Sequence, residues 1–189
     1  MHLIVASDIF GRTTALDTLV EELVTGSAVP SMSVDVVDPY GEQSLNFTDE
    51  AAAYNYFMSQ CGIEHYAHAI LDRLLVQAEH RRGSSQAEPV VALGFSVGAS
   101  AFWHLADRLS QLSVTRLLCF YGSQIRKDTQ RALSLATSLV LPSQESSFSV
   151  DELSQTLAGK KNLHLQRSSY AHGFMNKLSP QFNPQGYRE

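Results

Sequence analysis

Short apolar runs alternate with longer amphipathic stretches along the whole chain, and this alternation constrains the fold more than any other feature. The runs lack strict apolar–polar alternation, which is typical of strands buried on both faces. They lie at 3–6, 34–37, 90–95, 117–121, 139–141 and 163–165. Stretches with helical spacing lie between them, at 13–24, 49–80 with a break at Gly62, 96–109 and 150–157. The pattern predicts an α/β fold with a doubly wound, mainly parallel six-stranded sheet, flanked by helices on both faces.

Length and composition favour a single domain over 1–189. The chain has 189 residues, of which 44% are hydrophobic and 17% charged, as in ordinary globular domains. The formal net charge is −5 and no run rich in Lys or Arg is present, so we expect neither nucleic acid nor a membrane surface as a partner. Neither a spanning segment nor a secretion signal is visible, and Cys61 lies far from Cys119. We therefore expect a soluble, cytoplasmic protein without a disulfide framework or a metal site.

The sequence GFSVG at Gly94–Gly98 is the strongest candidate for chemistry. It stands where an apolar run gives way to an amphipathic stretch, and so at a predicted turn from strand to helix. A nucleophile on such a turn projects from a strained backbone, and small residues two positions to either side prevent a clash between strand and helix. The alternative is that Ser96 only caps the helix. We predict that Ser96 is a nucleophile.

A serine hydroxyl needs a base to take its proton and an acid to orient that base. In a fold of this kind the chain order is Ser, then the acid, then His, with the His after the last strand. His172 meets this demand because it follows the run at 163–165. The acid is expected after the preceding strand, where Glu145 comes first and Asp151 second. Asp151 also suits the first turn of a helix, so Glu145 is preferred and Asp151 stays an alternative.

The residues around these three suggest how a substrate would be bound. Two backbone N–H groups are needed for a developing oxyanion, and Val97 and Ile9 are the candidates by position. Asp8 could face the site or cap a helix. Arg12 and Arg167 are weaker candidates for binding a substrate carboxylate, with a plain surface location as the alternative.

The end of the chain and the connection after residue 121 carry two further expectations. Gly173 favours a sharp turn from His172 into a final helix, and the segment 179–189, with Pro and Gly, is expected to trail over the surface. The stretch from Tyr121 to the next strand is too short for a lid domain. We therefore expect an uncovered site that admits small substrates or is closed by a second copy in a homodimer.

These motifs together resemble the dienelactone hydrolase branch of the α/β-hydrolase superfamily, over about Leu3 to Phe174. The landmarks in register are Asp8–Gly11, Val37–Gly41, Gly94–Gly98, Phe120–Gly122, Gln144–Glu145 and His172–Phe174. Three positions depart from the family pattern. Ser96 stands where the founding members carry Cys, Glu145 where an Asp is usual, and Asp8 where a Glu is usual.

The resemblance implies a serine hydrolase that cleaves a small ester, lactone or thioester through an acyl-enzyme on Ser96, without a metal or organic cofactor. The three departures make a general ester or thioester as plausible a substrate as a lactone. A non-catalytic ligand-binding protein on the same scaffold is the alternative, because a fold does not fix a function. A nucleotide-binding domain is a weaker reading, since neither G-x-G-x-x-G nor a P-loop follows the first apolar run.

Overall fold

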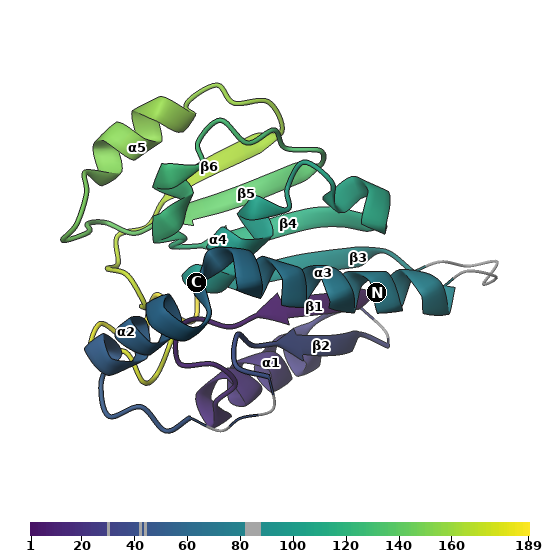
Figure 1. The fold of residues 1–189 in the computed structure, drawn as a ribbon, viewed down its shortest axis with the longest axis horizontal. Coiled ribbons are helices and arrows are strands. Elements are labelled where there is room, and N and C mark those ends of the chain that lie inside the picture. The colour runs from purple at the N-terminus through teal and green to yellow at the C-terminus, as the bar shows by residue number, and fades with distance from the viewer. Residues whose placement is uncertain (30, 42, 44, 82–87) are drawn as a thin grey trace.

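Six parallel strands form one sheet in the order β2-β1-β3-β4-β5-β6 (Figure 1). The computed structural model describes residues 1–29, 31–41, 43, 45–81 and 88–189. The strands are β1 (His2–Ala6), β2 (Ser33–Val37), β3 (Val90–Phe95), β4 (Val114–Phe120), β5 (Ala136–Leu141) and β6 (Leu163–Arg167). Every pairing is parallel, so the predicted sheet is confirmed. The strand order reverses beside β1, and in open α/β sheets ligands bind at the carboxyl ends of the strands where the order reverses.

Five α-helices and two short 3₁₀ helices connect the strands. They are α1 (Thr14–Gly26), α2 (Glu50–Gln60), α3 (Gly62–Arg81), α4 (Val97–His104), η1 (Leu109–Leu112), η2 (Ser123–Lys127) and α5 (Val150–Leu157). Thr13, Asp49 and Ser149 cap α1, α2 and α5 by accepting a backbone N–H of the first turn. The expected break at Gly62 is confirmed, since Gly62 has φ +72° between α2 and α3. None of the helices within the described residues has the length and apolar character needed to cross a membrane.

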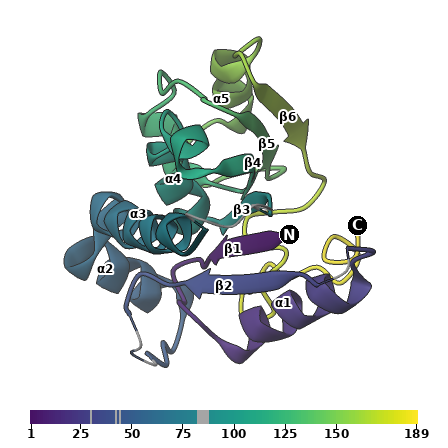
Figure 2. The ribbon, with the colours of Figure 1, turned by 90° about the vertical axis from the view of Figure 1, so that its right-hand side faces the viewer.

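The two faces of the sheet are covered by layers of different size. The larger core lies between the sheet and α3, α4 and α5, and α2 packs beside α3. The opposite face is covered by α1 and by the chain after β6, which form a smaller core around Phe95, Tyr121 and Phe174. Figure 2 shows α3 and α4 on one side of the sheet and α1 with the yellow C-terminal segment on the other. Helices therefore flank both faces, as predicted.

Two expectations about helices are wrong. The helix that begins after Ser96 ends at His104 instead of 109, because the Leu105 N–H bonds back to the Phe102 carbonyl and tightens the last turn. No helix follows Gly173, and residues 171–187 form a series of turns instead.

Residues 179–189 lie on the surface, as expected, with 180, 181, 184, 185, 188 and 189 exposed, but the end of the chain is packed against the fold. Phe174 is buried, and Met175 and Tyr187 pack against the smaller core. The Asn183 N–H donates to the Phe174 carbonyl at 3.0 Å, which folds the segment back on itself. Apolar contacts with α1 and the sheet thus hold in place a segment that has no regular secondary structure.

Candidate active site

Ser96 lies on a strained turn between β3 and α4. Its backbone has φ 50° and ψ −111°, a conformation that costs a non-glycine residue about 1–3 kcal/mol. Two neighbours hold it there. The Ser96 N–H donates to the Phe120 carbonyl at 2.9 Å, and the Ser100 hydroxyl donates to the Ser96 carbonyl at 3.0 Å. The strain is therefore balanced by bonds to β4 and α4, and the side chain of Ser96 points out of the turn into a cavity.

The small residues around Ser96 are required by close packing. A Cβ on Gly94 would lie 2.6 Å from the Ala99 backbone nitrogen, so only glycine lets the last residues of β3 approach α4. This contact agrees with the predicted reason for small residues in the GFSVG sequence.

A chain of hydrogen bonds joins Ser96, His172 and Glu145. The Ser96 Oγ lies 2.9 Å from His172 Nε2, and His172 Nδ1 lies 2.6 Å from Glu145 Oε1. With the proton on Nδ1, the imidazole donates to the carboxylate and accepts from the hydroxyl. The rings of Tyr121 and His172 lie 5.0 Å apart, so Tyr121 packs against the imidazole that the two bonds orient. The residues come from the ends of β3, β5 and β6, at the carboxyl edge of the sheet.

Asp151 and the two arginines singled out in the sequence lie elsewhere. Asp151 is exposed in the first turn of α5 and forms an ion pair with Arg167 at 2.6 Å. Arg12 pairs with Asp17 at 2.9 Å. Neither arginine is among the residues that line the cavity at Ser96. The structure thus brings Glu145, and not Asp151, to His172, and it does not place Arg12 or Arg167 where a substrate carboxylate would bind.

Ile9 and Val97 line the same cavity as Ser96. Val97 is the first residue of α4, a position whose N–H has no partner within its own helix. The hydroxyl of Tyr40 donates to the Ile9 carbonyl at 2.6 Å, which fixes the orientation of the loop after β1. Among the described residues no acceptor is found for the Ile9 N–H. Within the part of the chain that is described, neither amide thus has an acceptor of its own.

Asp8 ties the loop after β1 to the C-terminal segment. Its carboxylate accepts from the Phe10 N–H at 3.0 Å and from Asn176 Nδ2 at 2.6 Å. Burial raises the pKa of Asp8, although both hydrogen bonds and the nearby His172 act against that shift. Asp8 does not cap α1, because Thr13 does so. Its role is to anchor the segment that follows His172.

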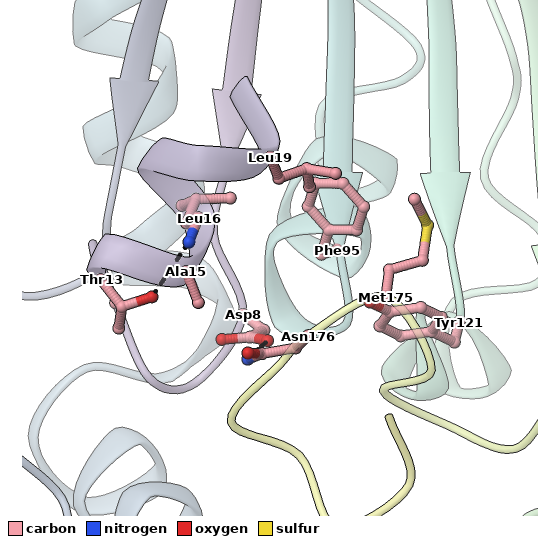
Figure 3. Close-up of a pocket in the computed structure, with 10 residues that line it drawn as sticks. Asp8, Thr13, Ala15, Leu16, Leu19, Phe95, Tyr121, Met175 and Asn176 are labelled. Carbon is pink, nitrogen blue, oxygen red and sulfur yellow. Dashed lines mark hydrogen bonds between the residues drawn. The ribbon is translucent and has the colours of Figure 1, made fainter. Parts of the chain in front are cut away.

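Figure 3 shows Asp8 and Asn176 beside each other at a small cavity under α1. Leu16 and Leu19 of α1 line one side, and Phe95 lies across from them. The volume is about 20 Å³, which holds little more than a single water molecule. This cavity is too small for a substrate, so a ligand site must be sought on the other side of Asp8.

The larger cavity at Ser96 has a volume of about 740 Å³. It is lined by the loop after β1, the first turns of α2, η2, the loop that carries Glu145 and the loop that carries His172. Glu50, Gln124 and Arg126 line it as well, and sequence reasoning missed all three. No local motif marks them, because they reach the cavity only through the packing of α2 and η2 around the sheet. Within the described residues, no three His, Cys, Asp or Glu side chains gather as a metal site would require.

Comparisons with known proteins agree with this architecture. No family model matches the chain. The uncharacterised protein YczH of Bacillus subtilis (strain 168) is 27% identical over 185 residues, which is 95% of this chain and 83% of YczH. A Klebsiella pneumoniae protein provisionally assigned as a dienelactone hydrolase has a TM-score of 0.74 at 16% identity, over 99% of this chain and 81% of its own. The dienelactone hydrolase-like promiscuous phosphotriesterase P91, from metagenomic libraries, has a TM-score of 0.68 at 16% identity, over 99% and 80%.

The chain therefore has the α/β-hydrolase fold, in the form found in dienelactone hydrolase-like structures. Identities of this size establish the fold. A fold alone does not determine an activity, which depends on the residues that this chain places in its cavity.

Proposed function

We propose that this chain is a serine hydrolase that cleaves small ester, lactone or thioester bonds through an acyl-enzyme on Ser96. The observation that carries the proposal is the pair of hydrogen bonds from Ser96 to His172, at 2.9 Å, and from His172 to Glu145, at 2.6 Å. A binding protein has no need of a serine, a base and an acid in contact. Solved structures of similar fold support the same class of reaction, since their descriptions name a provisionally assigned dienelactone hydrolase, a dienelactone hydrolase-like phosphotriesterase and lipolytic enzymes of lipase and esterase families.

The first half of the reaction transfers the acyl group to Ser96. His172 Nε2 takes the hydroxyl proton as Oγ attacks the carbonyl carbon, and Glu145 stabilises the imidazolium that forms. The oxyanion accepts hydrogen bonds from the N–H groups of Ile9 and Val97, which are the strongest source of stabilisation in such sites. The bond to the leaving group then breaks, and His172 gives its proton to the departing oxygen or sulfur.

The second half releases the acid. His172, again neutral, takes a proton from a water molecule as the water oxygen attacks the acyl carbon. The bond between that carbon and Ser96 Oγ breaks, and the proton returns from His172 to the serine. One ester and one water thus give one acid and one alcohol or thiol.

The size and openness of the cavity favour a small soluble substrate. A volume of about 740 Å³ falls within the range of about 300–1,000 Å³ that small-molecule sites occupy. The connection between β4 and β5 holds only η2 and turns, so this connection, which lies wholly within the described residues, adds no lid domain over Ser96. We propose a small acyl compound as the substrate and the cytoplasm as the place of the reaction.

The test is covalent labelling with a fluorophosphonate, followed by intact-mass measurement and peptide mapping. We expect one adduct, on Ser96, that is lost in His172→Ala and retained in Ser147→Ala, which changes a serine of the same cavity. If no adduct forms under conditions that label a control esterase, the hydrolase proposal fails. The non-catalytic ligand-binding protein would then be the better description.

A further inference from the structure

Gln124 is a polar side chain buried in the wall of the cavity at Ser96. It belongs to η2 and is 8% exposed. Its backbone N–H donates to the Ser100 hydroxyl at 3.3 Å, but within the described residues its carboxamide has no hydrogen-bond partner. The carboxamide is not sealed off, since the fully enclosed polar atoms without a partner in those residues are His2 Nε2 and the Tyr187 hydroxyl. It therefore faces the cavity, where a bound molecule can supply the partners that the protein does not.

Ser100 fixes the place of Gln124 relative to Ser96. Its hydroxyl accepts the Gln124 N–H and donates to the Ser96 carbonyl at 3.0 Å, so one buried side chain joins both backbones. Arg126 tightens η2 in addition, because its Nη1 donates to the Ser123 carbonyl. A residue whose backbone is fixed in this way loses little freedom when it binds a ligand.

The strand order places Gln124 on the side of Ser96 from which the alcohol departs. Along the carboxyl edge of the sheet, η2 and the loops after β5 and β6 lie on one side of β3. The loop after β1, which carries Ile9, lies on the other side. In the proposed reaction the oxyanion binds toward Ile9, and the leaving oxygen takes its proton from His172, which follows β6. Gln124 is therefore placed to contact the alcohol part of the ester.

Three further uncharged side chains that form hydrogen bonds line the same cavity, those of Ser123, Gln144 and Gln181. None of the three side chains is hydrogen-bonded to another group in the part of the chain that the structure describes. Hydroxyls and carboxamides both donate and accept, so they match a group that does the same without a charge. Because these residues lie on three separate loops, they suit a molecule that carries several hydroxyls.

Tyr54 adds an aromatic surface to this cavity. It lies on α2 and is 40% exposed, so its ring is open to a ligand. A sugar ring has hydroxyls around its edge and C–H groups on its faces. It can therefore pack against an aromatic face while its hydroxyls bond to amides and hydroxyls of the protein.

We propose that Gln124 forms a subsite for a neutral, hydroxyl-bearing alcohol part of the substrate. The preferred substrates are then acyl esters of sugars or of other polyols, in place of esters of plain alcohols. This inference rests on the proposed hydrolase function, because it specifies the alcohol that leaves Ser96 in the same cavity.

The experiment compares two butyrate esters of equal ring size, methyl α-D-glucopyranoside esterified at its primary hydroxyl and cyclohexylmethyl butyrate. Acid release measures kcat/KM for each. We expect the wild type to prefer the sugar ester. Gln124→Met keeps the length of the side chain without its donors and acceptor, so kcat/KM for the sugar ester should fall about 5- to 30-fold, the loss of one or two hydrogen bonds, with little change for the other ester. Turnover of the second ester also shows that the variant has folded.

Gln130→Met is the matched control, since Gln130 is exposed beyond η2 and does not line the cavity. It should leave both values unchanged. Equal losses for the two esters in Gln124→Met, no loss for either, or the same selective loss in Gln130→Met would overturn the subsite.

A second measurement separates this result from a failure of the hydrolase proposal. It is an NMR titration of methyl α-D-glucopyranoside into Ser96→Ala, with and without Gln124→Met. Binding that is weakened by Gln124→Met supports the subsite even if no ester is cleaved. Labelling of Ser96 by a fluorophosphonate, together with sugar binding that is absent or does not depend on Gln124, would leave the hydrolase standing and remove the subsite.

Discussion

Gly98 and Ala6 are in such close contact that no side chain fits between them. A Cβ on Gly98 would lie 2.5 Å from the Ala6 carbonyl oxygen, a distance that such atoms do not tolerate. Gly98 stands two residues after Ser96, and Ala6 is the last residue of β1. The contact therefore sets the spacing between the turn that carries Ser96 and the loop that carries Ile9.

Substitution of Gly98 by Ala is expected to damage stability and labelling together. The clash is with backbone, which cannot rotate away, so we expect a loss of about 1–3 kcal/mol in the free energy of unfolding. The fluorophosphonate reaction at Ser96 should slow as Ile9 and Val97 move apart. Gly26→Ala is the control, because nothing lies within 4 Å of its Cβ and alanine suits the end of α1. The measurement is the urea midpoint of unfolding for each variant and for the wild type. A midpoint in Gly98→Ala equal to that of the wild type would contradict the packing argument.

Glu145→Gln should impair hydrolysis strongly while the fold is retained. The amide keeps the size of the side chain but loses the charge that holds the Nδ1 proton of His172, and such a change in a serine hydrolase costs about 10⁴-fold in kcat. Asp151→Asn should have little effect, because Asp151 pairs with Arg167 on the exposed side of α5. The ratio of kcat in the two variants is the measurement. A greater loss in Asp151→Asn would make Asp151 the acid.

Asn176→Ala should destabilise the protein more at high pH than at low pH. Burial raises the pKa of Asp8, so the charged form is disfavoured in the fold, and the contribution of Asp8 to stability is lost as the pH rises through that raised pKa. Removal of the Asn176 donor raises this pKa further. The unfolding free energy should fall by about 1.5–3 kcal/mol where Asp8 is charged and by about 1 kcal/mol where it is neutral.

The measurement is urea unfolding of the wild type and the Asn176 variant at about pH 4 and about pH 8, because the charged fraction of a carboxyl group rises with pH. Asn55→Ala is the control, since Asn55 is exposed on α2 and is not a hydrogen-bond partner of the Asp8 carboxylate. A gap between wild type and Asn176→Ala that narrows as the pH rises would refute the role of Asp8 as a charged anchor.

Alkylation of cysteine should leave hydrolysis intact. Burial raises the pKa of Cys61 to about 11, and it also raises the pKa of Cys119, whose thiol donates to the Ala99 carbonyl at 3.6 Å. The thiolate is the reactive form, so both residues should react slowly with iodoacetamide at neutral pH and fully after denaturation. Intact mass before and after guanidinium checks this expectation. Inactivation by one rapid alkylation of the native protein would point to a role for a thiol that the geometry does not indicate.

The sheet and the three hydrogen-bonded residues Ser96, Glu145 and His172 could be predicted from the sequence because each depends on local signals. Buried strands can be recognised in a sequence as apolar runs. Gly94–Gly98 lies at the junction of such a run with a helix. The order of Ser96, Glu145 and His172 along the chain then narrowed the choice of base and acid. The choice between Glu145 and Asp151 needed the structure, since it depends on which loop turns toward His172.

The packing of the C-terminal segment and the surroundings of Arg126 could not be predicted from the sequence, because both depend on contacts between distant segments. Phe174, Met175 and Tyr187 are spaced too irregularly to show a period, and only contacts with α1 and the sheet hold them. Whether an arginine forms an ion pair depends on partners elsewhere in the chain, as Arg167 pairs with Asp151, which lies sixteen residues away in sequence. A sequence pattern reports what a segment prefers by itself, and these features depend on what other segments bring to it.

The hydrogen bond between Ser96 and His172 joins a residue that is translated early to one that is translated late. The two residues are 76 positions apart in sequence. His172 follows β6, in the last segment to be added to the face of the sheet that α1 covers. A nascent chain folds from its N-terminus, so it can display Ser96 long before the base exists. In the proposed reaction, the hydroxyl of such an intermediate becomes a nucleophile only when β6 has paired with β5 and the turns beyond β6 have packed against the smaller core. If chains of increasing length were tested, reaction of Ser96 with a phosphonate would therefore be expected only from chains long enough for His172 to have folded into place.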